Sequence, residues 1–94
     1  AIIGERSRRL KPINQAIAKT ENTIEIEETR LETLNQEMVQ ASQDQDGRRI
    51  AELSPAIRKC QETIDRLFSE LEKLYADKES VETETDSQLK ALDG

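Results

Sequence analysis

The sequence has 94 residues, of which 36% are charged and 34% hydrophobic, with one cysteine and no histidine. A chain of this length forms one domain at most, and it lacks the run of about 18 apolar residues that a transmembrane helix requires. It has neither a histidine nor a glycine-rich loop, so the residue types that most catalytic and phosphate-cradling sites use are missing. Composition therefore indicates a non-catalytic interaction module with no cofactor or metal of its own.

The formal net charge of −6 is distributed unevenly along the chain. Residues 1–11 and 48–59 each carry +3, whereas residues 12–47 and 60–94 each carry −6. A negative long-range field repels phosphate, so the net charge does not favour bulk binding of nucleic acid. Two local basic patches are the exception, and their members are Arg6, Arg8, Arg9 and Lys11 in the first and Arg48, Arg49, Arg58 and Lys59 in the second.

The chain begins Ala1-Ile2-Ile3-Gly4, with neither a methionine nor the apolar core of a signal peptide. We therefore expect a domain excised from a longer protein. The single cysteine, Cys60, has no partner for an internal disulfide, which fits a reducing cytoplasm.

Apolar residues recur at heptad spacing in both halves of the chain, at what we call seam positions. Residues 41–47 separate the halves with a cluster of turn formers. A period of 3.5 residues sustained over several heptads indicates a left-handed coiled coil. The apolar seam residues are Ile3, Leu10, Ile17, Ile24, Leu31 and Met38 in the first half, and Ile50, Leu53, Ile57, Cys60, Ile64, Leu67, Leu71, Leu74 and Val81 in the second.

The turn predicts that the two halves pair antiparallel. Facing residue numbers then share a constant sum, as in Ile24 with Leu67 and Leu31 with Cys60. The turn itself fixes that sum, and a short helix–helix connection is compatible with it.

Polar seam residues favour the same arrangement. A parallel homodimer would place Glu27 against Glu27 and Lys78 against Lys78, which are like-charge contacts. In a hairpin each faces an isoleucine instead, so its stem lies along the apolar partner and its head stays in water. The predicted fold is therefore an all-α, monomeric, two-helix antiparallel coiled-coil hairpin.

The hairpin is predicted to span residues 6–82, with a first arm over about 6–41, a turn over 42–49 and a second arm over about 50–82. Residues 1–5 are expected to form a linker. Residues 83–94 are expected to be a frayed or disordered tail, because polar residues take over the seam and helix propensity is poor.

Two prolines interrupt the helical pattern. Ser54-Pro55 fits either a helix start, as N-cap and first helical residue, or a kink within a helix. Pro12 poses the same choice. We predict helix before both prolines, with a bend at each.

Two groups of residues could suggest chemistry. Cys60 occupies a seam position and is predicted to be a small buried hydrophobe, since no base accompanies it. The acidic run Glu25, Glu27, Glu28 and Glu32 is predicted to be a solvated face. A straight helix cannot bring together the six to eight oxygens of a calcium site, so we predict no metal site.

Phe68 and Tyr75 lie seven residues apart beside the second-half seam. They either broaden the apolar stripe or form a protein-docking strip. The second basic patch, Arg48, Arg49, Arg58 and Lys59, lies at and just below the predicted tip, either as a phosphate contact or as a solvated turn. No aromatic residue is interleaved with it, so base stacking is not expected.

The order of segments resembles a known family. Arg8-Arg9-Leu10-Lys-Pro-Ile13, then Arg30-Leu-Glu-Thr-Leu-Asn-Gln-Glu-Met38, a polar turn, Arg48-Arg-Ile-Ala-Glu-Leu53, and finally Leu67-Phe-Ser-Glu-Leu-Glu-Lys-Leu-Tyr75 follow one another. This succession is similar to the C-terminal coiled-coil domain of class F ATP-binding cassette ATPases (ABC-F; Uup and its relatives).

The resemblance covers about residues 6–82 and implies a two-helix arm of a larger ATPase that acts at the ribosome in translation. It implies DNA binding in the Uup branch, and ATP with Mg²⁺ only in the cassettes of the parent protein, because this chain carries no nucleotide-binding motif. The leading hypothesis is a cytoplasmic accessory domain with weak contacts to ribosomal RNA or DNA, and with the cassettes of its parent as a further partner. The alternative is a structural tether or a protein–protein or dimerisation arm.

Overall fold

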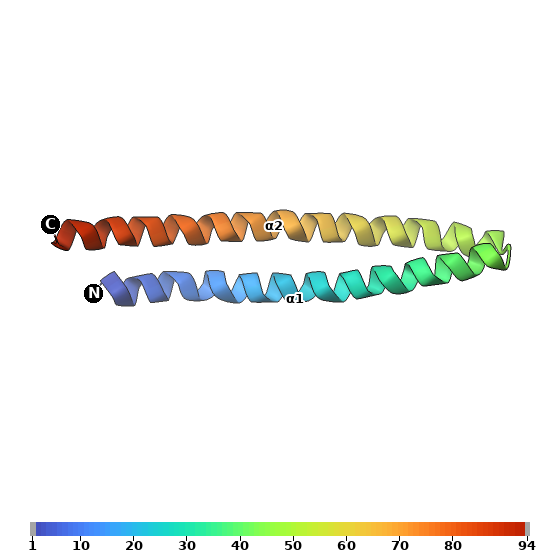
Figure 1. Cartoon of the computed structure of the whole chain (residues 1–94), viewed down its shortest axis with the longest axis horizontal. Helices are drawn as coiled ribbons and strands as arrows, with labels where there is room; N and C mark the ends of the chain where they lie inside the picture. Colours follow the sequence, from blue (N-terminus) through green and yellow to red (C-terminus); the bar gives the residue numbers. More distant parts are fainter. Residues whose placement is uncertain (1, 94) are drawn as a thin grey trace. The chain divides into compact units, whose positions relative to one another are not determined.

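The computed structural model describes residues 2–93 of the chain and the side chains of residues 4–91. It consists of two long helices, α1 (Ile2–Gln43, 42 residues) and α2 (Gly47–Asp93, 47 residues), with no strand in this range. The two helices pack against each other in antiparallel directions, with a connection of only three residues between them (Figure 1). The predicted all-α helical hairpin is confirmed.

The hairpin divides into two compact units, each containing a stretch of both helices. Unit 1 comprises residues 1–21 and 69–94, and unit 2 comprises residues 22–68, which include the turn. Each unit has its own set of buried seam residues, so each is described by itself.

In unit 2 the predicted seam is the buried core. Ala41 is 1% exposed, Ile24 and Cys60 are each 5% exposed, and Ile64 and Leu67 are each 8% exposed. The partners Ile24 and Leu67 are thus both buried, as a facing pair requires. The smallest of these side chains, Ala41, lies in the last turn of α1 beside the connection.

In unit 1 the seam continues beyond the predicted end of the hairpin. Ile17 and Val81 are each 7% exposed, and Thr85 is fully buried. The Thr85 hydroxyl donates to the Val81 carbonyl of the preceding turn at 2.9 Å, so a polar side chain fills a core position without an unpaired donor.

The end of α1 is closed by backbone hydrogen bonds around Gln45. The amide of Asp46 donates to the Ala41 carbonyl at 2.9 Å, and the amide of Gln45 donates to the Ser42 carbonyl at 3.2 Å. This pair of bonds is a Schellman motif, which requires a left-handed residue at its centre. Gln45 takes that conformation with φ of 56°.

Asp46 begins the next helix. Its Oδ1 accepts a hydrogen bond from the Arg49 backbone amide at 3.1 Å, which is the N-cap interaction of α2. One residue therefore ends the C-cap of α1 and caps α2, and this shared role makes a three-residue connection sufficient.

The predicted boundaries need correction. The turn covers residues 44–46 rather than 42–49, and α2 begins at Gly47. The expected linker and the expected frayed tail are helical over residues 2–5 and 83–93, and residues 1 and 94 lie outside the described residues.

Two features explain the helix beyond residue 82. The seam stays closed because Thr85 is buried. Two ion pairs of 2.9 Å also join α1 to this segment, Arg6 to Asp86 and Arg9 to Glu84. Each exposed pair contributes only about 0–1 kcal/mol, and the hydrogen bond from Arg9 lowers the pKa of the Glu84 carboxyl.

Both prolines lie within helices, so the prediction of helix before each is confirmed. Ser54 is no N-cap, since its hydroxyl donates to the Ile50 carbonyl at 2.9 Å. Pro12 and Pro55 are exposed, as are Arg8 and Ala51, whose carbonyls the prolines leave without an intrahelical donor. The exposed surface lets water reach these carbonyls, and the predicted bends stay a prediction.

We expect Gln45→Gly to raise the free energy of unfolding by about 0.5–1 kcal/mol, because glycine adopts a positive φ without a Cβ clash. Gln43→Gly, in the last turn of α1, is the matched control and should lower the free energy of unfolding by about 0.5–1 kcal/mol. Urea denaturation followed by circular dichroism measures both changes. A Gln45→Gly protein less stable than the parent chain would contradict the Schellman assignment.

Candidate nucleic-acid interface

The four basic residues predicted for the tip, Arg48, Arg49, Arg58 and Lys59, are all exposed in unit 2. Arg48 and Arg49 lie in the first turn of α2, directly after the connection. Lys59 and Arg58 lie about three turns further along the same helix, at 3.6 residues per turn. The structure therefore gives all four access to a partner, but it does not gather them on one surface.

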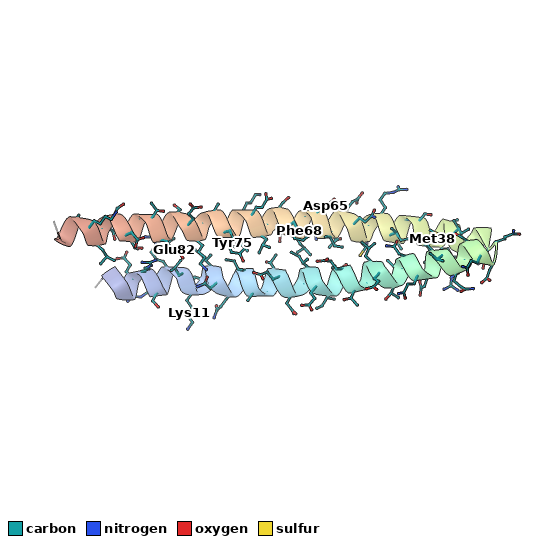
Figure 2. All side chains as sticks on the ribbon, viewed as in Figure 1. Lys11, Met38, Asp65, Phe68, Tyr75 and Glu82 are labelled. Atoms are coloured by element: carbon teal, nitrogen blue, oxygen red, sulfur yellow. The ribbon has the colours of Figure 1, made fainter. Side chains whose placement is uncertain are left out.

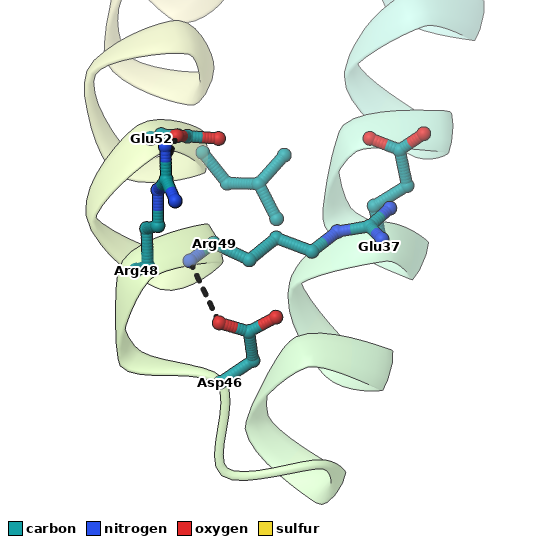
Figure 3. A pocket seen from close by; sticks show the side chains of 6 residues that line it. Glu37, Asp46, Arg48, Arg49 and Glu52 are labelled. Carbon is teal, nitrogen blue, oxygen red and sulfur yellow. Dashed lines mark hydrogen bonds and ion pairs between the residues drawn. The ribbon is translucent and has the colours of Figure 1, made fainter.

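The tip arginines share a shallow hollow with carboxylates. It is lined by Glu37 of α1 and by Asp46, Arg48, Arg49, Glu52 and Leu53 of the turn and α2 (Figure 3). The Arg49 side chain extends across this hollow toward Glu37 (Figure 3). Three carboxylates thus accompany two guanidinium groups, and the positive potential at the tip is weaker than the sequence patch indicates.

Arg48 makes one ion pair, in which its Nε lies 3.6 Å from Glu52 Oε1. The two side chains are 92% and 68% exposed. An exposed pair four residues apart on a helix contributes about 0.3–0.5 kcal/mol, which a phosphate can displace at little cost. Arg48 therefore remains available for binding.

A second hollow in unit 2 brings Lys59 together with a residue that sequence analysis did not consider. It is lined by Glu27 and Arg30 of α1 and by Ala56, Lys59, Cys60 and Thr63 of α2. The missed residue is Arg30, which in the sequence is surrounded by the acidic run and belongs to neither basic patch. Heptad spacing provides the signal for it, because Arg30 lies seven residues before Glu37, which lines the first hollow.

Arg58 does not join Lys59. Adjacent side chains leave an α-helix about 100° apart, and these two lie on opposite sides of the seam residues Ile57 and Cys60. Seven residues after Arg58 comes Asp65, whereas seven residues after Lys59 comes Arg66. The two neighbours therefore lie in surroundings of opposite charge.

Cys60 is buried, as predicted, and its Sγ lies 3.3 Å from the Glu27 carbonyl oxygen and 3.4 Å from Glu27 Oε2. The single thiol proton can be donated to only one of them at a time. Burial, followed by the hydrogen bond to Glu27 and the charge of that carboxylate, raises the pKa of the Cys60 thiol, with Arg30 opposing the shift. The thiol is thus held in its unreactive protonated form.

The two aromatic residues are half-exposed, Phe68 at 46% and Tyr75 at 47%. Phe68 belongs to unit 2 and Tyr75 to unit 1, and both lie on α2 (Figure 2). In unit 1 the Tyr75 hydroxyl donates to Glu21 Oε1 of α1 at 2.9 Å. The interpretation that Tyr75 covers Glu21 gains a direct contact, and half of each ring still faces solvent.

The acidic run behaves differently from residue to residue. Glu25, Glu28 and Glu32 are exposed, whereas Glu27 is half-buried beside Cys60. Within residues 2–93 no three Cys, Asp or Glu side chains lie close enough to hold a metal ion. In the same range, neither helix contains a stretch long and apolar enough to cross a membrane.

Comparisons with known proteins add no assignment. No protein-family model, no curated protein and no solved structure matches the chain. Its function has therefore to be argued from its own residues.

Tyr75 should titrate above the ordinary pKa of tyrosine, because its hydroxyl donates to Glu21 and partial burial and the Glu21 charge act in the same direction. It is the only tyrosine in a chain without tryptophan, so absorbance near 295 nm reports it alone. Glu21→Gln should lower the pKa of Tyr75 toward the ordinary value. Glu25→Gln, one helical turn away, is the control, and an equal effect of both changes would rule out the specific contact.

Proposed function

We propose that the chain is a non-catalytic accessory arm of an ABC-F-type ATPase, acting in the cytoplasm and touching nucleic acid, ribosomal RNA or DNA, through basic residues near the hairpin tip. The observation that carries the proposal is the exposure of Arg48, Arg49, Arg58 and Lys59 in unit 2. Only one of these four side chains, that of Arg48, is in an ion pair, and that pair is loose.

The segment order described above supports the family assignment. ATP and Mg²⁺ belong in this proposal to the parent cassettes, which are also a candidate docking partner of the arm. The chain itself has a net charge of −6. Binding should therefore be weak and strongly dependent on salt, since a few phosphate contacts must overcome a repulsive long-range field.

The test is a fluorescence anisotropy titration with a duplex DNA and with a ribosomal RNA fragment over a range of salt concentrations. The tip variant carries Arg48→Gln, Arg49→Gln, Arg58→Gln and Lys59→Gln. We expect it to bind at least about tenfold more weakly than the parent chain, because each lost phosphate contact lowers the salt slope by about 0.9. Glutamine preserves helix propensity, so the fold should be retained.

The matched control removes four exposed charges from unit 1, at Arg8, Lys11, Lys73 and Lys90, by the same change to glutamine. It alters the net charge equally and should retain most of the binding. Equal, weak binding by the parent chain and the tip variant would reject the tip as a nucleic-acid site.

A second candidate function is a structural tether or a protein–protein or dimerisation arm, with Phe68 and Tyr75 as its contact residues. The half-exposed aromatic rings favour it, because aromatic residues are enriched at interfaces. Sedimentation equilibrium separates the two proposals. A stable dimer at micromolar concentration supports the second, and a monomer that binds nucleic acid supports the first.

A further inference from the structure

The charges of unit 2 are segregated onto two flanks of the helix pair, one on each side of the seam. The first flank is defined by the hollow that Arg30, Ala56, Lys59 and Thr63 line together. Side chains seven residues apart lie on one helix face, which adds Arg49, seven before Ala56, and Arg66, seven after Lys59. We call the set Arg30, Arg49, Lys59 and Arg66 the cationic flank.

The opposite flank is acidic. Glu28 and Glu32 lie two residues from Arg30 on either side and so leave α1 about 160° away from it. With Leu31, Asn35, Gln36 and Val39 they line a separate hollow. On α2, Asp65 lies seven residues from Arg58, whose charge is the only positive one in this group.

The cations of the first flank are available to a partner. Three carboxylates share it, those of Glu27, Glu37 and Glu52. Glu27 is turned toward Cys60 and Glu52 toward Arg48. Among the described side chains, no carboxylate lies within 4.0 Å of the charged groups of Arg30, Lys59 or Arg66.

The geometry points to the phosphodiester backbone of a nucleic-acid duplex as the ligand of the cationic flank, with Arg30 and Arg66 as contact residues and Arg58 outside the site. This inference rests on the proposed function and changes which residues perform it. The acidic flank would repel the same backbone, so only one orientation of the helix pair allows contact.

Two observations favour contact with the backbone over reading of the bases. None of the flank residues is aromatic, so bases have no stacking platform. The flank consists of two helices side by side, each about 10–12 Å across with side chains, whereas the DNA major groove, about 12 Å wide, admits only one. The recognition we infer is therefore independent of sequence and of the sugar.

The test compares two triple variants of the full chain that remove the same charge. The flank variant is Arg30→Gln, Lys59→Gln and Arg66→Gln, and the off-flank variant is Arg58→Gln, Arg8→Gln and Lys73→Gln. Fluorescent DNA and RNA duplexes of 20 base pairs and one sequence serve as probes. Circular dichroism confirms that both variants keep their helix content.

We expect the flank variant to bind at least tenfold more weakly, with a slope of log K against log salt that falls by about 2.7, or 0.9 for each of three contacts. The off-flank variant should bind within about twofold of the parent chain. The parent chain should bind the DNA and RNA duplexes with similar affinity.

Three outcomes overturn the inference. Equal losses in the two triple variants would mean that charge, and not placement, decides binding, while the tip proposal could stand on its own four-residue test. A preference above tenfold for DNA or for RNA would exclude recognition of the backbone alone. If the parent chain binds neither duplex, the proposed function fails together with the inference.

Discussion

The structure depends on the burial of two heptad seams against each other. Within unit 2 the buried residues are apolar except for a thiol that donates to Glu27, and within unit 1 the seam ends in a threonine that bonds to its own helix. Two helices bury little surface, and an isolated helix in water is marginal. Every side chain outside the seam is consequently exposed or half-exposed, and the chemistry of the chain is that of its flanks.

The seam also decides which charges meet. Residues of one flank come from α1 and α2 in alternation, so neighbours in sequence can separate and distant residues can converge. Arg58 and Lys59 separate in this way, and Arg30 joins Lys59 across the helix pair. A linear basic patch is therefore a poor guide to a basic surface on a coiled coil, whereas heptad position is a good one.

The sequence was sufficient for the fold class, the seam and the burial of Cys60, because a 3.5-residue period and a single turn leave one compact antiparallel pairing. Propensity misled at residues 83–93, where the Thr85 hydroxyl satisfies itself on the Val81 carbonyl. The three-residue connection was missed because a Schellman motif usually carries glycine at the position of Gln45. The site was half foreseen, since exposure of the tip residues followed from their charge but their division between two flanks did not.

The most direct test of the account is a disulfide between Ile24→Cys and Leu67→Cys in a Cys60→Ala background. Facing seam positions bring Cβ atoms close enough for a bridge, so oxidation should give an intramolecular cross-link and a monomer on a non-reducing gel. Ile26→Cys with Leu67→Cys is the control, since Ile26 is 58% exposed on the outer surface of α1 and should not cross-link within the chain. Cross-linking of the 24–67 pair only between molecules would contradict the fold and the flank geometry that follows from it.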